Sequence, residues 1–348
     1  LIPASYLSGL ENNSEIAVKA WVSLDGSNSL DTAKYFKVPT YVTRKGTGEI
    51  IRHITAGNGP AKIVISRDGT TACVANSRAN AISIINLTTD AVRTLSTPYA
   101  YAAYRLALHP TDSRLFISAY GVAANSNILV FNISSFSFSY PYNYGAITQA
   151  ICLNPTGSRV LFGPNTAYGN YALFGYNTIS NQLSTYYTGT SAPRAAIVDP
   201  QGISAFTTGV NTERFIFSSG LRTHTVVNGG VAQELAHSPL NSPLERLYVS
   251  VSAINRVEIY NTADEGLTHV KTLTGLSDPR GIAFHPTLPR AYVAELSGNR
   301  VRVIDMNSET LIGTINGFDQ PNGLACTPDG QYLLVCNSGN TTVAVVSI

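Results

Sequence analysis

The sequence contains an internal repeat. The clearest copies begin at Gly59, Pro279 and Pro321, and weaker copies begin near Tyr104, Gln149, Arg194 and Gln233. The period is roughly 40–47 residues, which is the length of one four-stranded blade of a β-propeller. Each copy contains four short β segments, called a to d in chain order, and no stretch has the sustained 3.6-residue periodicity of a helix. The repeat predicts an all-β chain with almost no helix.

Turn residues separate the four segments. Segment a is followed by Pro-x-Gly, as in residues 155–157 and 200–202, where proline fixes φ and glycine supplies a positive φ for a tight hairpin. Segment c ends in Asn or Asp, whose side chains bond the local backbone of a turn: Asn86, Asn132, Asn177, Asn261 and Asp305. These turns predict antiparallel sheets of four consecutive strands.

Six copies are complete, and a seventh stops at Ile348 after its segment c. The missing segment d is found at the other end of the chain, because residues 47–54 (TGEIIRHI) match residues 308–315 (SETLIGTI). We therefore predict a seven-bladed β-propeller of four-stranded antiparallel blades over residues 46–348, with the last blade closed by an N-terminal strand. Such closure leaves no exposed sheet edge.

Residues 1–45 fall outside the repeat. Residues 15–24 alternate between apolar and polar side chains like a strand. Two interpretations stay open: a lead-in segment that packs on the side or bottom of the propeller, or the tail of a preceding sandwich domain.

Composition excludes several classes of protein. Only 13% of the residues are charged, about half of the ~25% that is usual, while 44% are apolar. A disordered chain or a coiled coil needs more charge, and no apolar run approaches the ~18 residues of a membrane span. The net charge of +2 argues against a nucleic-acid partner. We expect no membrane insertion.

The four cysteines lack the CxxC spacing of a zinc or redox site. Each lies in an apolar stretch, so we expect small buried hydrophobic side chains: Cys73, Cys152, Cys326 and Cys336. The alternative is a disulfide between Cys326 and Cys336 on neighbouring strands.

The segment b sequences resemble the YVTN family of propeller repeats, which is named for a Tyr-Val-x-Asn run. The corresponding residues are 73–76 (CVAN), 248–251 (YVSV), 292–295 (YVAE) and 334–337 (LVCN). The resemblance covers about residues 46–348 and implies a secreted, cell-surface or periplasmic protein. It implies no single activity, because the wider group includes lactonase-like enzymes, electron-transfer subunits and non-enzymatic binders.

Propeller ligands bind most often at the mouth where the d–a and b–c loops meet. The residue after each d–a turn is expected to form a ring there: Ala61, Tyr104, Gln149, Arg194, Gln233, Arg280 and Asn322. The next position adds Lys62, Arg105 and Glu234, so four cations face one carboxylate and predict a positive potential. Alternatively, these residues bond neighbouring loops and one another.

Three consecutive d–a connections are rich in tyrosine: Tyr99, Tyr101 and Tyr104; Tyr140, Tyr142 and Tyr144; Tyr186 and Tyr187. Tyrosine offers a flat apolar face and a polar tip at low entropic cost, which suits binding surfaces. On adjacent blades these residues would form an arc over one mouth. The alternative is that they fill the gaps between blades.

Polar residues occupy the last position of segment a. His109 and His285 lie there, with a less certain alignment for His237, and other blades have Ser66, Asn154, Asp199 and Thr327. All are residues that can bond the backbone of the a–b turn. Because the histidines lie on different blades, we predict no metal site and no cofactor.

These residues predict a non-enzymatic recognition or scaffold propeller, monomeric, that binds a saccharide or protein partner at the mouth. The predicted contacts are Tyr99, Tyr101, Tyr104, Tyr142, Tyr144, Gln149, Arg194, Arg280 and Asn322. The alternative is a lactonase-like hydrolase with Glu295 or Glu234 as general base beside Arg280 or Arg194. The sequence has no Gly-x-Ser-x-Gly nucleophile elbow, and the identity of the ligand stays open.

Overall fold

The computed structural model describes residues 15–16, 19–23, 33–37, 41–42, 48–98, 102–120, 127–143, 148–164, 171–240, 242, 244–263 and 266–348. The chain divides into two compact units, one of Leu1–Glu49 with Ile348 and one of Ile50–Ser347. In the smaller unit β1 (Glu15–Ile16) pairs with β4 (Tyr41–Val42), and β2 (Lys19–Ser23) pairs with β3 (Ala33–Lys37). Whether this unit is a lead-in segment or part of a preceding domain stays a prediction.

The larger unit consists of seven four-stranded antiparallel sheets, one for each predicted blade. Blade 1 contains β6 (Pro60–Ile65), β7 (Thr71–Asn76), β8 (Ala81–Asn86) and β9 (Val92–Ser96). Blade 2 contains β10 (Ala102–Leu108), β11 (Arg114–Tyr120), β12 (Asn127–Asn132) and β13 (Ser137–Asn143). Blade 3 contains β14 (Thr148–Leu153), β15 (Arg159–Pro164), β16 (Tyr171–Asn177) and β17 (Leu183–Gly189).

The next three blades repeat the pattern. Blade 4 contains β18 (Ala195–Val198), β19 (Ser204–Thr208), β20 (Asn211–Ile216) and β21 (Arg222–Val227). Blade 5 contains β22 (Glu234–His237), β23 (Arg246–Val251), β24 (Arg256–Asn261) and β25 (Thr268–Leu273). Blade 6 contains β26 (Pro279–Phe284), β27 (Arg290–Glu295), β28 (Arg300–Asp305) and β29 (Thr310–Asn316). A short 3₁₀ helix, η2 (Ser252–Ile254), follows β23.

Blade 7 joins the two ends of the ring. It contains β30 (Pro321–Cys326), β31 (Tyr332–Asn337), β32 (Thr342–Ser347) and, as its outermost strand, β5 (Ile50–Thr55). Strand β5 pairs antiparallel with β32, with Val343 opposite Ile54 and Ala344 opposite His53. The prediction that an N-terminal strand closes the last blade of a seven-bladed propeller is confirmed.

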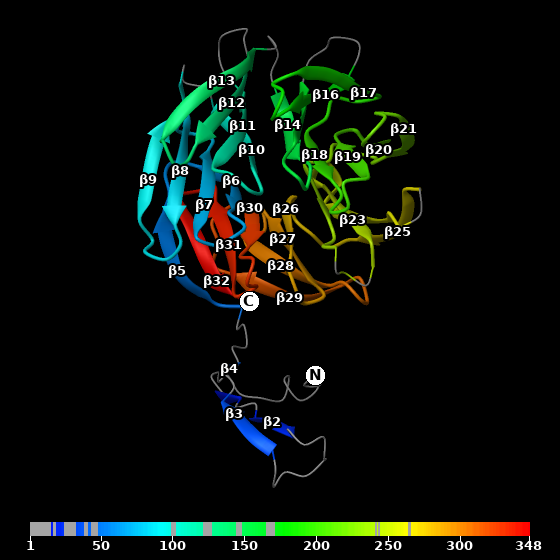
Figure 1. Cartoon of the computed structure of the whole chain (residues 1–348). Helices are drawn as coiled ribbons and strands as arrows, with labels where there is room; N and C mark the ends of the chain where they lie inside the picture. The colour runs from blue at the N-terminus through cyan, green and yellow to red at the C-terminus, as the bar shows by residue number, and fades with distance from the viewer. Residues whose placement is uncertain are drawn as a thin grey trace. The chain divides into compact units, whose positions relative to one another are not determined.

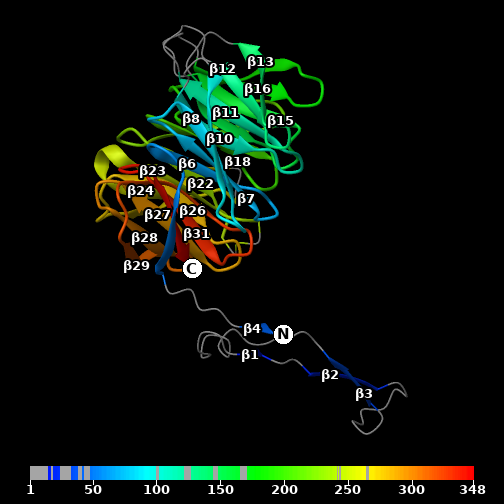
Figure 2. The same ribbon diagram turned by 90° about the vertical axis from the view of Figure 1, so that its left-hand side faces the viewer.

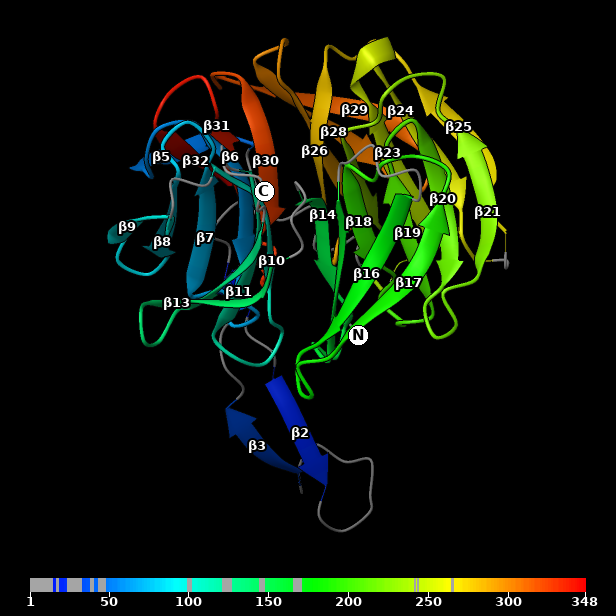
Figure 3. The same ribbon diagram turned by 90° about the horizontal axis from the view of Figure 1, so that it is seen from above.

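The blades surround a common axis. Figure 1 shows β6, β10, β14, β18, β26 and β30 towards the centre, while β9, β13, β21, β25 and β29 lie outermost. The turned views show the antiparallel neighbours within single blades: β28 and β29 lie side by side in Figure 2, and β16 and β17 in Figure 3. Strand a of each blade therefore presents its free edge to the channel.

Hydrophobic side chains fill the interfaces between neighbouring blades. Cys73 and Ile84 of blade 1 belong to one buried cluster with Leu106, Ile117 and Phe131 of blade 2. This face-to-face packing of sheets around the ring fixes where each strand a begins.

The polar residues at the ends of segments a and c cap turns as predicted. The side chain of Asn154 accepts a hydrogen bond from Arg159 N at 2.9 Å, and that of Asp199 accepts one from Ser204 N at 2.7 Å. His285 does the same through Nδ1, which accepts from Leu288 N at 2.9 Å, while its Nε2 lies 3.0 Å from Gly330 O of the next blade. His285 is therefore a turn cap.

His237 does not occupy this position. Its alignment with His109 was one residue out, because β22 ends at His237 and Ser238 takes the capping role, with its hydroxyl accepting from Arg246 N at 3.0 Å. His237 instead places Nε2 2.9 Å from the Thr262 hydroxyl.

All four cysteines are free. Cys326 lies opposite Leu333 rather than Cys336, so the register of β30 and β31 gives no disulfide between them. Burial raises the pKa of Cys73, Cys152, Cys326 and Cys336 to about 12. The thiols are therefore protonated at neutral pH, in agreement with their expected role as small apolar side chains.

Candidate functional site: the channel mouth

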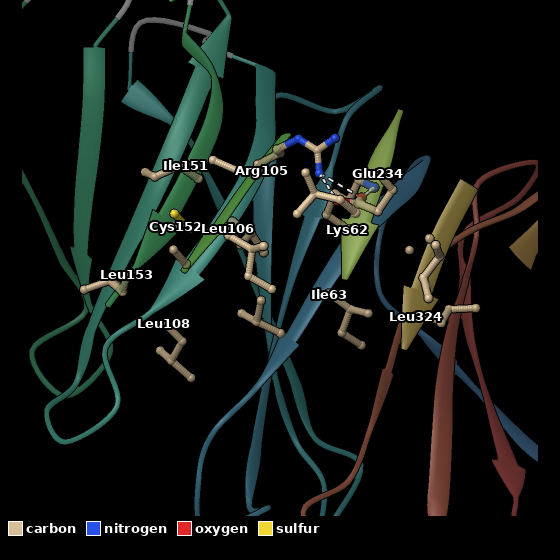
Figure 4. A pocket seen from close by; sticks show the side chains of 18 residues that line it. Lys62, Ile63, Arg105, Leu106, Leu108, Ile151, Cys152, Leu153, Glu234 and Leu324 are labelled. Atoms are coloured by element: carbon tan, nitrogen blue, oxygen red, sulfur yellow. Dashed lines mark hydrogen bonds and ion pairs between the residues drawn. The ribbon is translucent and has the colours of Figure 1, made fainter. Parts of the chain in front are cut away.

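The mouth is formed where the a strands begin. Three charged side chains from the second mouth position meet across the channel axis: Lys62 of blade 1, Arg105 of blade 2 and Glu234 of blade 5 (Figure 4). Arg105 Nη1 donates hydrogen bonds to both carboxylate oxygens of Glu234, at 2.7 and 2.8 Å, and Lys62 Nζ forms an ion pair with Glu234 Oε2. We call these three residues the channel triad.

Arg105 also binds backbone carbonyl groups that immediately precede β18 and β22. Its Nε donates to the carbonyl oxygen of Arg194 at 2.7 Å, and its Nη2 donates to the carbonyl oxygen of Gln233. One guanidinium thus ties blade 2 to blades 4 and 5, and Glu234 extends the link to Lys62 in blade 1. The fixed fork of donors on arginine is suited to this kind of bridging.

Burial makes the charges of the triad interdependent. The exposed fraction of the side chain is 8% for Arg105, 15% for Glu234 and 17% for Lys62. Burial alone would raise the pKa of Glu234, but the charges and hydrogen bonds of Arg105 and Lys62 outweigh it and lower that pKa to about 2. Burial also lowers the pKa of Lys62, assisted by the charges of Arg105 and Arg280 and opposed by Glu234. The triad therefore contains two cationic side chains and one carboxylate, and the positive potential of the whole mouth stays a prediction.

Small residues occupy the equivalent position in the other four blades: Ala150, Ala195, Gly281 and Gly323. A Cβ on Gly281 would lie 2.4 Å from the carbonyl oxygen of Asn322, and one on Gly323 would lie 2.6 Å from that of Ala61. The a strands of blades 6, 7 and 1 approach so closely that only glycine fits between them. Long charged side chains span the mouth from blades 1, 2 and 5 instead.

A cavity of about 320 Å³ lies within the channel. Its walls contain aliphatic side chains, including Ile63, Leu106, Ile151 and Leu324, and the channel triad also lines it (Figure 4). The inner edges of the a strands line this cavity too, so backbone polar groups lie among the aliphatic ones.

The first-position ring is partly tied to neighbours. Arg194 Nη1 donates to Gln233 Oε1 at 3.4 Å, and Arg280 forms a two-point ion pair with Asp278, with Nε and Nη2 each 2.9 Å from a carboxylate oxygen. Gln149 Oε1 is buried and has no hydrogen-bond partner among the described residues. Asn322 is half-buried, and Ala61 is buried. Arg194 and Arg280 therefore bond neighbouring residues, which agrees with the alternative interpretation of the ring, whereas Gln149 Oε1 has no such bond among the described residues.

The structure describes five of the eight tyrosines predicted to form the arc. Tyr104 is half-buried, with the Arg105 guanidinium 5.7 Å from its ring centroid. Tyr99, Tyr101 and Tyr144 lie outside the described residues. Tyr140 and Tyr142 belong to β13, and Tyr186 and Tyr187 to β17, so these four are in outer strands rather than in loops as expected. Both strands extend further along the chain than expected, to Asn143 and Gly189.

Glu295 and Arg280 do not form the pair that a lactonase would use. Glu295 is fully buried at the end of β27 and forms ion pairs with Arg300, directly opposite it on β28, and with Arg302 at 3.7 Å. Glu234 likewise pairs with Arg105 and Lys62 rather than with Arg194 or Arg280. The low pKa and the engaged oxygens of Glu234 make it a weak proton acceptor at neutral pH.

Sequence reasoning missed the partners of these charges. The turn over residues 296–299 brings Glu295 and Arg300 face to face, and this hairpin pairing was a detectable signal. The bond between Arg105 and Glu234 joins residues 129 positions apart and had no local signal beyond opposite charge at one repeat position.

The described part of the chain contains no group of three or more His, Cys, Asp or Glu side chains arranged to hold a metal ion. No helix in it has the length and apolar character needed to cross a membrane.

Known structures share this fold. The chain superposes on a chain of hydrazine synthase from Kuenenia stuttgartiensis with a TM-score of 0.71 and 16% identity, covering 84% of this chain and 96% of that one. A chain of a mitotic checkpoint complex gives 0.74 and 15% identity over 90% of this chain and 96% of that one. The Cps50 (Swd1) propeller domain of Myceliophthora thermophila gives 0.70 and 12% identity over 86% and 99%.

At such low identity these structures support the propeller fold alone. No protein-family model matches the sequence, and no curated protein matches it.

Proposed function

We propose that the protein is a non-enzymatic recognition propeller of the YVTN type, secreted, displayed on the cell surface or periplasmic, which binds a partner at the channel mouth. The observation that carries the proposal is the channel triad. Because Arg105 and Glu234 are tied to each other and to the strand backbone, the mouth is a preorganised polar floor rather than an open pore. Preorganised surfaces lose little entropy when a partner binds.

Two features of the mouth are suited to a polar partner. The triad gives the mouth positive charge, which attracts the acceptor groups of a polar partner. Arg194 and Arg280 surround this floor with further donors, although Arg280 is partly neutralised by Asp278.

A protein partner is the first choice. Among the similar structures, one is a chain of a mitotic checkpoint complex, that is, a propeller inside a protein assembly. A saccharide is the second choice, since the sequence predicts tyrosines in three consecutive d–a connections, including Tyr101 and Tyr142, and tyrosine rings suit stacking on sugars.

The experiment compares the wild-type propeller with Arg194→Ala and Tyr142→Ala on a glycan array and in affinity capture from the extracellular fraction of its source. Arg67→Ala is the matched control, because Arg67 is exposed in the a–b turn at the other end of the propeller. We expect at least a tenfold loss of signal for the mouth variants and none for the control. Binding that survives every mouth substitution would overturn the proposed site.

Hydrolysis is the competing function. A panel of lactones is assayed with the wild type, Glu295→Gln and Arg280→Ala, and unfolding is monitored to confirm intact folding. Turnover by the wild type that is abolished in both folded variants would replace the recognition proposal with a lactonase. Absence of turnover across the panel, together with mouth-dependent binding, supports recognition.

A further inference from the structure

The channel triad has one positive charge more than its carboxylate neutralises. Lys62 and Arg105 are cationic, and among the described residues Glu234 is the only carboxylate that pairs with either of them. All three side chains are largely buried, with exposed fractions between 8% and 17%. Buried charges are usually paired in proteins, because water no longer solvates them. The triad therefore lacks one negative charge.

Lys62 is the member of the triad that can still bind an anion. Its ammonium group has three protons, and among the described residues it donates only to Glu234. Burial has the largest effect on the pKa of Lys62 and lowers it, while Glu234 raises it. The charges of Arg105 and Arg280 lower the same pKa further. A second anion beside Lys62 would stabilise its charged form, and two of its donors are available to bind one.

The channel cavity provides room for such an anion and for an apolar group attached to it. The three side chains of the triad line the cavity of about 320 Å³ together with aliphatic side chains. Figure 4 shows the charged groups of the triad gathered together, apart from Leu108 and Leu153. Small-molecule sites in proteins have volumes of about 300 Å³ or more, with mostly apolar walls and a few polar groups. The cavity combines a cationic part and an aliphatic part in this way.

We propose that the channel cavity binds a small monocarboxylate with an aliphatic chain. The carboxylate accepts hydrogen bonds from Lys62 and supplies the missing negative charge, and the chain packs against the aliphatic walls. A monoanion balances the single excess charge, whereas a dianion would leave the triad with an excess of negative charge. The inference does not depend on the partner proposed for the mouth, because the ligand lies inside the channel.

The test is isothermal titration calorimetry of the full chain with acetate, butanoate and hexanoate. We expect the affinity to rise about threefold for each added methylene, the ratio that corresponds to burying one methylene group. Hexan-1-ol, the uncharged probe, should bind at least tenfold more weakly than hexanoate. An affinity that does not change with chain length would overturn the proposal. Inorganic phosphate that binds as tightly as hexanoate would replace it with a general anion site.

Variants locate the site. Lys62→Met keeps a side chain of similar length without the charge, and Lys271→Met is the matched control on β25, the outermost strand of blade 5. We expect Lys62→Met to weaken hexanoate binding at least tenfold, since a hydrogen bond to a charged group contributes that much, and the control to bind like the wild type. Arg280→Gln, which removes a second charge that acts on Lys62, should weaken binding at least twofold.

An unchanged unfolding midpoint confirms that each variant is folded, and Arg280→Gln carries the test if Lys62→Met is not. Hexanoate that gives no binding heat at about 10 mM would overturn the proposal, and so would equal affinity in the wild type and the folded variants. Either result leaves the glycan-array and capture experiments on the mouth unaffected, so the two proposals fail separately.

Discussion

Replacing Glu234 with glutamine keeps the shape of the side chain and removes the negative charge between Arg105 and Lys62. The pKa of Glu234 falls from 4.5 to about 2 in the folded protein. At about 1.4 kcal/mol for each tenfold change in acidity constant, this difference corresponds to about 3 kcal/mol of stability at neutral pH. The side chain is only 15% exposed, so solvent screening reduces this value little.

The sign of the pH dependence follows from the lowered pKa. The stabilisation by Glu234 is fully present above the unfolded pKa of about 4.5, and it is lost as pH falls from there towards about 2. We therefore expect Glu234→Gln to lower the free energy of unfolding by about 3 kcal/mol at pH 7, in the range known for breaking a buried ion pair. The difference from the wild type should shrink steadily below pH 4.5.

The assay is urea unfolding at pH 7, 5 and 3, followed by circular dichroism. Glu49→Gln is the matched control, because Glu49 is exposed and carries the same charge. A loss smaller than about 1 kcal/mol at pH 7 would refute the reasoning. A loss of equal size at pH 7 and pH 3 would show that the amide disturbs packing rather than charge.

Three other perturbations test the structure. Gly323→Ala should lower the free energy of unfolding by roughly 1–3 kcal/mol in a thermal melt, because its Cβ would lie 2.6 Å from Ala61 O. Gly266→Ala is the control and should be tolerated, because the atom nearest to its Cβ would be 3.4 Å away. Ellman's reagent should leave Cys73, Cys152 and Cys336 unreacted in the folded protein and titrate all four thiols in urea. Prompt reaction of all four in the folded protein would contradict the burial of these three. Burial lowers the pKa of His109 and His285, so their contribution to stability should fall as pH drops through about 6.5. The variant that combines His109→Asn and His285→Asn should lose less free energy of unfolding than the wild type between pH 7 and 5. An equal loss in the two proteins would contradict this expectation.

The fold could be predicted because its information is local and repeated. A hairpin turn such as residues 155–157 specifies its own strand pair, and seven copies of one pattern specify the ring. Even the closure of blade 7 by β5 could be predicted, since residues 47–54 match segment d of blade 6.

The site was less predictable because its contacts cross the ring. Arg105 was placed at the mouth correctly, but its partner depends on how far a guanidinium reaches across the axis. That reach depends on the close approach of the a strands at Gly281 and Gly323, which only the assembled ring establishes. The extent of β13 and β17, which moved Tyr142 and Tyr187 from loops into strands, likewise depends on pairing with neighbours.

The pairing of β5 with β32 also orders events during biosynthesis. Strand β5 leaves the ribosome before every other strand of the ring, and its partner β32 leaves after all of them. The nascent chain therefore holds an unpaired edge at each end until translation of the ring has finished. A truncated product keeps both edges exposed, so proteases and chaperones can distinguish it from the finished protein by this one missing pairing.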